Sequence, residues 1–307
     1  MKNVLISLVV IFSIFQISCK EEKDTAIQTP TASKLFYTKS SSDTVIGKID
    51  LKNGNLATDF SRGAASGLIG NSLVSLALNT KTGDIYVTNE EDNGPIFKIN
   101  TNGVASIFFN GTEAKSPGGI AYNSTNDKIY WINRGNGKVY SLNADGSGSA
   151  VALYGGANVN AKGYSIQLDE VNNKLYYANF NAIYKGNLDG TGTPAVLYGF
   201  LADTIDSPSN IALDVANNKI YWTDENANVV GSANLDGTGN FKILFNNSLH
   251  GVTRSDGLAI DTKGGKIYWT ETAGSVSRIR IGNLNGSGTP VTLQSGFDSY
   301  GLLLKFE

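Results

Sequence analysis

The side chains that could do chemistry in this chain are carboxylates, amides and a few guanidiniums, gathered in short polar loops such as Asn89–Asn93, Asn133–Asn136 and Asp224–Asn226. Carboxylate and amide oxygens suit polar recognition or a calcium ion. The chain has one Cys and one His among its 307 residues. Zinc sites of the Cys/His kind, Cys-His nucleophile pairs and CxxC redox motifs need more of these residues, so we expect none of them.

The charge balance excludes a further class of protein. The sequence has 25 Lys and Arg residues against 27 Asp and Glu residues. A protein that depends on phosphate contacts needs a basic surplus. We therefore expect no nucleic acid among the partners of this chain.

The polar loops follow an apolar-aromatic tetrad that recurs along the chain. Successive tetrads start 44 to 50 residues apart, and all three Trp residues take the same place in them. The tetrads are Leu35–Thr38, Ile85–Thr88, Ile129–Ile132, Leu175–Ala178, Ile220–Thr223 and Ile267–Thr270. Alternate residues of a strand face opposite sides, and here both sides are apolar. This pattern is typical of strands buried between stacked sheets.

Two further elements complete each repeat. An Asn-Gly or Asp-Gly pair such as Asp236-Gly237 follows each tetrad by 14 to 18 residues, and such pairs favour tight hairpins because they accept positive φ. Ahead of most tetrads lies a segment of alternating small and large residues, such as Asn210–Asp214, which predicts an inner strand beside a tapering axis. Each repeat thus predicts four antiparallel strands.

Six such repeats predict an all-β fold, a six-bladed β-propeller of four-stranded antiparallel blades over residues 34 to 307. The first repeat lacks an inner strand, whereas Tyr300–Leu304 matches Asp256–Ile260 in spacing and character. We therefore expect the C-terminal strand to become the inner strand of the first blade. This would close the ring and remove its open edges.

The fifth repeat carries the family resemblance. Its Ile220–Asp224 segment, Ile-Tyr-Trp-Thr-Asp, and its Asn234–Gly237 segment, Asn-Leu-Asp-Gly, resemble the YWTD repeat of the low-density lipoprotein receptor family. The resemblance covers residues 34 to 307 and implies a six-bladed propeller that binds proteins outside the cell without catalysis. In the other blades the position of Asp224 is held by Lys39, Asn89, Asn133, Asn179 and Glu271. The family's Cys-rich modules are absent from this sequence, so its endocytic role does not carry over.

The antiparallel blades divide the loops between two faces. The hairpin face carries the inner turns and the Asn/Asp-Gly hairpins, and there we expect Asp169, Asp214 and Asp261 to make Asx-type turn hydrogen bonds. The variable face carries the loops after the tetrads and the links between blades, where a rigid scaffold places recognition. The predicted ligand-binding residues of the variable face are Glu90, Glu91, Asp92, Arg134, Asn136, Phe180, Asn210, Asp224, Glu225, Arg254, Asp256 and Glu271.

Three classes of function are consistent with such a face. The first is non-catalytic binding of an extracellular protein or glycan, with neither a catalytic residue nor a cofactor. The second rests on a resemblance to gluconolactonase-type propellers, calcium-dependent hydrolases in which a Glu, an Asn and an Asp near the axis hold a divalent cation. Asn210 and Asp256, with Glu90 or Glu271, are the candidates for that set. The third is a structural accessory subunit of an outer-membrane assembly.

The lone His250 does not favour an enzyme. It lies in the loop Ser248–Gly251, and the sequence shows no partner that would orient it as a general base. We therefore expect it to be a surface loop residue.

The first 33 residues predict export and anchoring. The apolar run Val4–Ile17 predicts a secretory signal, because it is shorter than the about 20 residues that span a bilayer. Ile17-Ser18-Cys19 resembles the bacterial lipoprotein signal, which implies a lipoprotein signal peptide over residues 1 to 18 and a lipid on Cys19. Residues 19 to 33 comprise this Cys and a polar, Thr-rich segment, which predicts a flexible tether.

The residues after Cys19 add a location. Lys20-Glu21-Glu22 resembles the tag that sends Bacteroidetes-type lipoproteins to the cell surface. We therefore expect a monomeric propeller at the outer membrane, surface-exposed, with the lipid anchor as its membrane contact.

Overall fold

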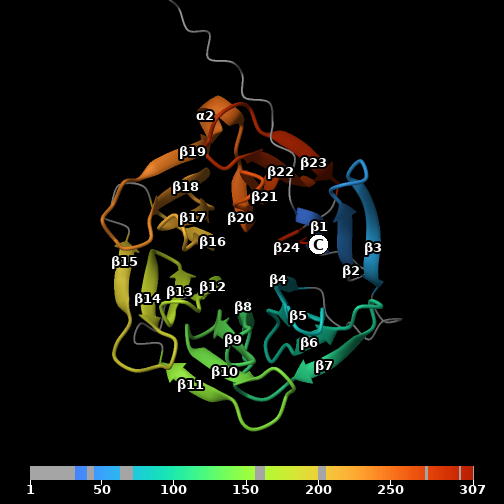
Figure 1. Ribbon diagram of the computed structural model, residues 1–307, viewed down its shortest axis with the longest axis vertical. Coiled ribbons are helices and arrows are strands. Elements are labelled where there is room, and N and C mark those ends of the chain that lie inside the picture. Colours follow the sequence, from blue (N-terminus) through green and yellow to red (C-terminus); the bar gives the residue numbers. More distant parts are fainter. Residues whose placement is uncertain are drawn as a thin grey trace, which may run out of the picture.

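The computed structural model describes residues 32–39, 45–62, 72–155, 163–199, 205–273, 276–296 and 299–306. The predicted signal peptide and Cys19 lie outside the described residues. Within them, strands make up six four-stranded antiparallel sheets, arranged as blades around a central axis (Figure 1). The predicted all-β six-bladed propeller is confirmed.

The first three blades run from the inner to the outer strand as follows. Blade 1 contains β24 (Leu302–Phe306), β1 (Ala32–Lys39), β2 (Val45–Asp50) and β3 (Leu56–Arg62). Blade 2 contains β4 (Leu73–Leu78), β5 (Ile85–Asn89), β6 (Ile96–Ile99) and β7 (Ala105–Phe109). Blade 3 contains β8 (Pro117–Asn123), β9 (Lys128–Asn133), β10 (Val139–Asn143) and β11 (Val151–Tyr154).

The other three blades repeat this order. Blade 4 contains β12 (Ser165–Asp169), β13 (Lys174–Asn179), β14 (Ala182–Asn187) and β15 (Ala195–Gly199). Blade 5 contains β16 (Pro208–Asp214), β17 (Lys219–Asp224), β18 (Val229–Asn234) and β19 (Lys242–Asn246). Blade 6 contains β20 (Arg254–Asp261), β21 (Lys266–Ala273), β22 (Val276–Asn283) and β23 (Val291–Ser295), and the one-turn helix α2 (Asn247–His250) precedes it.

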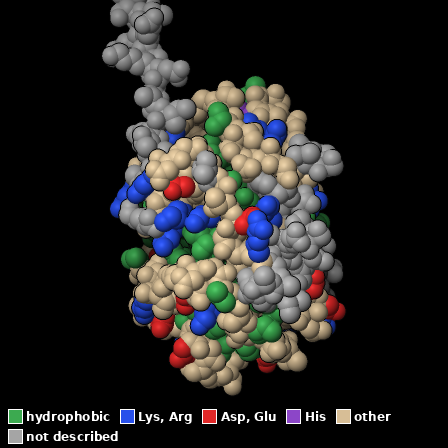
Figure 2. Space-filling model, turned by 90° about the vertical axis from the view of Figure 1, so that its right-hand side faces the viewer, with side chains coloured by type: hydrophobic (Ala, Val, Ile, Leu, Met, Phe, Trp, Pro, Cys, Tyr) green, Lys and Arg blue, Asp and Glu red, His purple; other side chains and the backbone are tan. Residues whose placement is uncertain are grey.

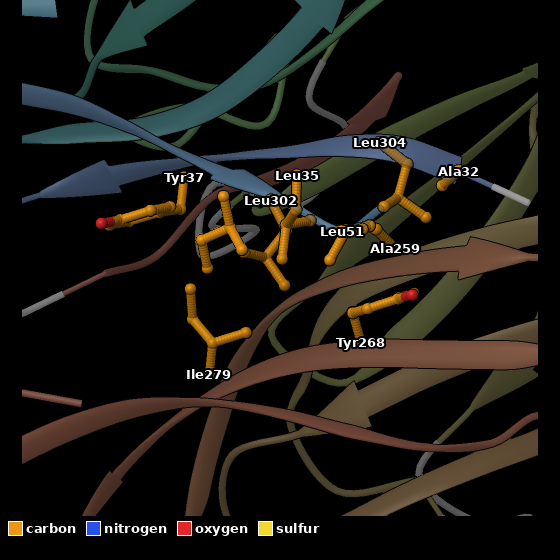
Figure 3. Packing of buried hydrophobic residues seen from close by; sticks show 10 residues of the cluster. Ala32, Leu35, Tyr37, Leu51, Ala259, Tyr268, Ile279, Leu302 and Leu304 are labelled. Carbon is orange, nitrogen blue, oxygen red and sulfur yellow. The ribbon is translucent and has the colours of Figure 1, made fainter. Parts of the chain in front are cut away.

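The tetrad strands lie second from the axis in every blade and are buried on both faces. In β17, every residue from Ile220 to Asp224 is buried, and Trp131, Trp222 and Trp269 are fully enclosed. Separate apolar clusters fill the spaces between neighbouring blades. The cluster between blades 6 and 1 joins Tyr268 and Ile279 to Leu35 and Leu302 (Figure 3). Packing between stacked sheets therefore holds the ring together, as the two-sided apolar pattern predicted.

The turns of the hairpin face are built by short polar side chains. The Gly of each Asn/Asp-Gly pair has positive φ, for example 89° at Gly237, as the hairpin prediction required. The predicted Asx turns are also present. The backbone N of Asn172, Asn217 and Gly264 donates to the Oδ1 of Asp169, Asp214 and Asp261, respectively, at 2.7 to 3.2 Å.

The ring closes through the C-terminal strand. β24 pairs with β1 in antiparallel register, with Leu304 opposite Leu35 and Leu302 opposite Tyr37. Ala32 falls within the predicted tether, but it belongs to β1, and its backbone N donates to Asp261 Oδ2 of blade 6 at 3.0 Å. The predicted closure is confirmed.

The outer wall of the ring mixes all kinds of side chain. Figure 2 looks at the wall on the side of β3, where Lys and Arg side chains gather with acidic ones among them. Asp59 is paired there with both Lys39 and Arg62. Among the residues that the structure describes, no helix has the length and apolar character needed to cross a membrane.

Removing the closing strand should break the fold. We expect deletion of residues 298 to 307 to abolish cooperative thermal unfolding, because it exposes the edge of β1 and removes Leu302 and Leu304 from the cluster between blades 6 and 1. Circular dichroism at increasing temperature measures this. Phe306→Ala is the control, because this side chain of β24 is 51% exposed and its loss should change the curve little. An unchanged curve for the deletion would contradict the closure.

Candidate functional site

A small cavity opens at the variable-face end of the central channel, and we call it the mouth. Its volume is about 100 Å³. Each blade contributes one residue at the same register position, at or just before its inner strand: Val74, Gly118, Tyr164, Ser209, Asp256 and Tyr300. Glu90, Arg134, Asn210, Arg254 and Gly163 complete the lining. The mouth is therefore a place on the variable face where all six blades meet.

The inner strands come unusually close together at the mouth because glycines lack a side chain. A Cβ on Gly257 would lie 2.4 Å from the carbonyl oxygen of Tyr300, and one on Gly301 would lie 2.6 Å from that of Val74. Real Cβ atoms do not tolerate such distances. These glycines let the backbones of blades 6, 1 and 2 approach, which keeps the cavity narrow.

The first guanidinium of the mouth, that of Arg134, forms an ion pair and packs against an aromatic ring. The Nη1 of Arg134 donates to Glu90 Oε2, and its guanidinium lies over the ring of Tyr164, 4.9 Å from the ring centroid. Burial alone would lower the pKa of Arg134, but the Glu90 carboxylate and the Tyr164 side chain together outweigh it and raise the pKa. The side chain is thus a fixed positive charge, stabilised by an ion pair and a cation–π contact.

A second guanidinium lies between two carboxylates. The Nε of Arg254 is 2.9 Å from Glu225 Oε1 and 3.9 Å from Asp256 Oδ2. The Arg254 side chain is 49% exposed, whereas that of Asp256 is 13% exposed. Arg254 is therefore the accessible cation of the mouth, and Asp256 lies beneath it.

Asp256 is the under-satisfied group of this site. Its Oδ2 is buried and has no hydrogen-bond partner among the described residues. Burial raises the pKa of Asp256 from 3.8 to about 7, and Glu225 and Glu90 add to the rise, whereas Arg254 and Arg134 oppose it. Desolvation disfavours the charged form of a carboxyl group, so Asp256 titrates near neutral pH.

The structure brings some of the predicted residues together and leaves others apart. Glu90, Arg134, Asn210, Arg254 and Asp256 line the mouth, and Glu225 adjoins it through Arg254. Glu91, Asp92, Asn136 and Phe180 do not line it; Asn136 is half-buried and the other three are exposed. These four belong to the surrounding loops.

Asp224 and Glu271 are fully buried and cannot meet a ligand. Asp224 accepts hydrogen bonds from the backbone N of Asp206, Ser207 and Ala227 at 2.8 to 3.1 Å. The sequence predicts both residues in the loops because each directly follows a tetrad. The structure corrects this, because β17 ends at Asp224 and β21 extends to Ala273.

Glu271 is the centre of a buried charge network. Its Oε1 lies 2.5 Å from Arg278 Nε and 3.2 Å from Arg280 Nη1, and its Oε2 accepts from Trp269 Nε1 at 3.1 Å. Arg280 also donates to the carbonyl oxygens of His250 and Pro290. This carboxylate therefore ties β21 and β22 to the link between blades 5 and 6.

The sequence did not point to Tyr164 and Tyr300, which line the mouth. Both stand at the register position of Asp256 in their own repeats, directly before the residue that aligns with Gly257. Applying the repeat register to every blade would have found them. Polarity alone could not, because a Tyr before an inner strand looks like another packing residue.

The hydrolase alternative requires a Glu, an Asn and an Asp to converge, and Glu90, Asn210 and Asp256 do line one cavity. However, Glu90 pairs with Arg134, and Arg254 lies beside Asp256. A cation would have to displace or face two guanidiniums, so these residues do not fit calcium. The described residues contain no cluster of three or more His, Cys, Asp or Glu able to hold a metal ion.

His250 belongs to the loop scaffold of α2. Its Nδ1 accepts from the backbone N of Asn246 at 3.3 Å, and its ring packs edge-on against Phe245 at 5.2 Å between centroids. Asn246 caps the helical turn by accepting from the backbone N of Leu249. His250 therefore helps to fix this loop, and no carboxylate is among these contacts.

Comparison with known proteins supports the fold. No protein-family profile matches the chain. It is 30% identical over 117 residues to protein cueball of Drosophila willistoni, a match that covers 36% of this chain and 17% of that protein. The chain thus spans about a fifth of the length of the curated relatives it matches.

Solved structures match over more of the chain. A chain of the nidogen/laminin complex has a TM-score of 0.71 at 18% identity, covering 89% of this chain and 98% of that one. An auxiliary nutrient binding protein from Bacteroides thetaiotaomicron VPI-5482 has a TM-score of 0.63 at 11% identity, covering 77% and 63%. TolB from Acinetobacter baumannii has a TM-score of 0.60 at 13% identity, covering 91% and 68%. These likenesses show the shared propeller fold.

The Glu271 network should be structural. We expect Glu271→Gln to lower the free energy of unfolding by about 3–5 kcal/mol, because it leaves the buried Arg280 guanidinium without its carboxylate. Urea denaturation measures this. Glu91→Gln, on an exposed side chain of the same face, should change stability by at most about 0.5 kcal/mol. Equal effects of the two variants would refute the structural role.

Asp256 should make stability depend on pH. The folded chain holds its proton up to about pH 7, whereas an unperturbed Asp releases it near 3.8, so unfolding between these values releases a proton. Stability therefore falls as pH rises through this window. We expect Asp256→Asn to raise the urea midpoint relative to the native chain more at pH 8 than at pH 5. The same difference at both pH values would show that Asp256 does not titrate in this window.

Proposed function

We propose that this chain is a non-catalytic binding protein whose variable face recognises an extracellular protein, with the mouth at the centre of the contact. The observation that carries the proposal is the mouth itself. All six blades converge on a cavity with an accessible guanidinium and an under-satisfied carboxylate. Two such groups offer orientation-specific recognition, because charge-assisted hydrogen bonds are strong and directional.

Exposed apolar side chains elsewhere in the loops support a macromolecular ligand. Phe180 at the tip between β13 and β14 is 49% exposed, and Leu249 of α2, at the outer rim of the ring, is also exposed (Figure 1). Exposed aromatic side chains such as Phe180 are enriched at protein interfaces. A cavity of about 100 Å³ holds only a small part of a ligand, so the loops would contact the rest.

The comparisons include both binding proteins and an enzyme on this fold. The propellers with a similar fold are a chain of the nidogen/laminin complex, a nutrient binding protein and a luciferin-regenerating enzyme, among others. At 18% and 11% identity, the shared feature is the fold that presents a face of loops. A protein ligand is the first candidate, and a glycan is the second.

We also propose that Cys19 carries a lipid that anchors the propeller at the outer membrane, exposed at the cell surface as a monomer. The support is the sequence of the first 33 residues. The position of Ala32 is compatible with this arrangement, because its backbone N contacts Asp261, which forms an inner turn of the hairpin face. A tether joined there leaves the variable face open to a ligand.

Binding arrays test the proposed face. The native chain is applied to arrays of extracellular proteins and of glycans, beside Arg254→Gln combined with Phe180→Ala. We expect the double variant to lose at least about tenfold in affinity, which corresponds to about 1.4 kcal/mol. The control is Lys263→Gln, an exposed residue of the hairpin face.

The outcomes separate the candidates. Signals that fall in the double variant and persist in the control support the variable face. Signals that are equal in all three chains would place the contact elsewhere. Signals confined to the glycan array would replace the protein with a glycan as ligand.

A further inference from the structure

The charges of the mouth do not balance when Asp256 is ionised. Arg134 and Arg254 then face three carboxylates, those of Glu90, Glu225 and Asp256. When Asp256 is protonated, two guanidiniums face two carboxylates. One proton therefore decides whether the mouth carries a negative charge or none.

We propose that the mouth binds a carboxylate of the protein ligand, an Asp or Glu side chain, and that Asp256 takes up one proton when it does. The inference rests on the proposed function for the identity of the partner, and it names the group that enters the cavity. A ligand carboxylate and a protonated Asp256 together carry the same charge as the ionised Asp256 alone. Protonation of Asp256 thus offsets the negative charge that the ligand carboxylate brings.

The donors of the mouth favour a carboxylate, and its size admits one. The cavity of about 100 Å³ has room for more than one water-sized group. Both ion pairs of Arg254 run through Nε, and the guanidinium fork carries further N–H donors on its terminal nitrogens, which suit bidentate carboxylate recognition.

Asp256 supplies a further donor to the ligand. Its protonated carboxyl group donates its O–H to an oxygen of the incoming carboxylate, and the proton comes from solution. No covalent bond forms or breaks in the ligand. The buried Oδ2 lies 3.9 Å from Arg254 Nε and has no hydrogen-bond partner among the described residues, so protonation of Asp256 removes a charge that is poorly hydrogen-bonded in a desolvated place.

The groups that face Asp256 come from several blades. Arg254 lies on the same strand, and Glu225 follows β17 in blade 5. Arg134 and Glu90 belong to the loops of blades 3 and 2, and Tyr164 and Tyr300 line the wall beside them. Because the pKa of Asp256 is about 7, the protonated fraction falls about tenfold between pH 6 and pH 8. The apparent affinity for a carboxylate follows this fraction.

Acetate serves as the probe, and acetamide is its neutral counterpart of the same size. The full chain is titrated with each at pH 6 and pH 8, and the Nε–H resonance of Arg254 is followed by NMR. We expect acetate to bind about tenfold more tightly at pH 6 than at pH 8. Acetamide should bind more weakly than acetate at pH 6.

Three variants make the test specific. Asp256→Asn keeps a neutral donor, so acetate should bind equally at both pH values. Arg254→Gln should lose acetate binding at both, followed in this case through the Arg134 resonances. Asp145→Asn, a matched change at an exposed residue of the hairpin face, should behave as the native chain.

Three results would overturn the inference. These are tighter acetate binding at pH 8, equal affinity for acetate and acetamide, or pH dependence that persists in Asp256→Asn. The result of the array experiment is independent of the result of the acetate titration. If the arrays place the macromolecular contact elsewhere while acetate still binds as expected, the mouth is an anion site and the proposed protein face is wrong.

Discussion

The structure depends on one constraint, which is that each tetrad strand must be covered on both faces. A single blade cannot do this, because its aromatic side chains would remain exposed on one side. Trp222, for example, lies with Ile220 in a cluster that also includes Tyr176 and Ile211. The chain satisfies the constraint by stacking blades until the last one meets the first, so that no blade lacks a neighbour. The inner strands and the central channel result from that closure.

The repeated register of the blades also determines which residues line the mouth. Because every blade repeats one register, a single position in the repeat faces the variable end of the channel six times over. Glycine at Gly118, Gly257 and Gly301 brings neighbouring backbones together there. The blades differ at this position, with an Asp in one and a Tyr in two others, and this difference distinguishes the mouth from a uniform ring. A structural repeat thus produces an asymmetric site through a few substitutions.

The fold could be predicted because its signals are local and repeated. The tetrads, the Asn/Asp-Gly pairs and the match between Tyr300–Leu304 and Asp256–Ile260 each report on chain segments of a few residues. The site was predictable only in part. Glu90, Arg134 and Asp256 were found because polar residues beside a tetrad or an inner strand reach the variable face.

The remaining side chains depend on long-range contacts that no local pattern contains. Glu271 looks like a loop carboxylate until Arg278 and Arg280 from the next strand bury it. Asp224 is similar, because the backbone groups that it accepts from include Asp206 and Ser207 of the preceding link. Tyr164 looks like a packing residue in the sequence, and only the contact of its ring with the Arg134 guanidinium makes it part of the site.

The position of β1 also determines how the ring would carry mechanical force. β1 lies between β24 and β2, hydrogen-bonded to both along its length. A pull on the chain ahead of Ala32 would act along the strand direction and would load the two ladders in shear, so that many hydrogen bonds share the force. A pull applied to an outer strand such as β23, which is paired with β22 alone among the described strands, would meet one ladder. The closing blade is therefore the point at which a tethered propeller would resist extension best.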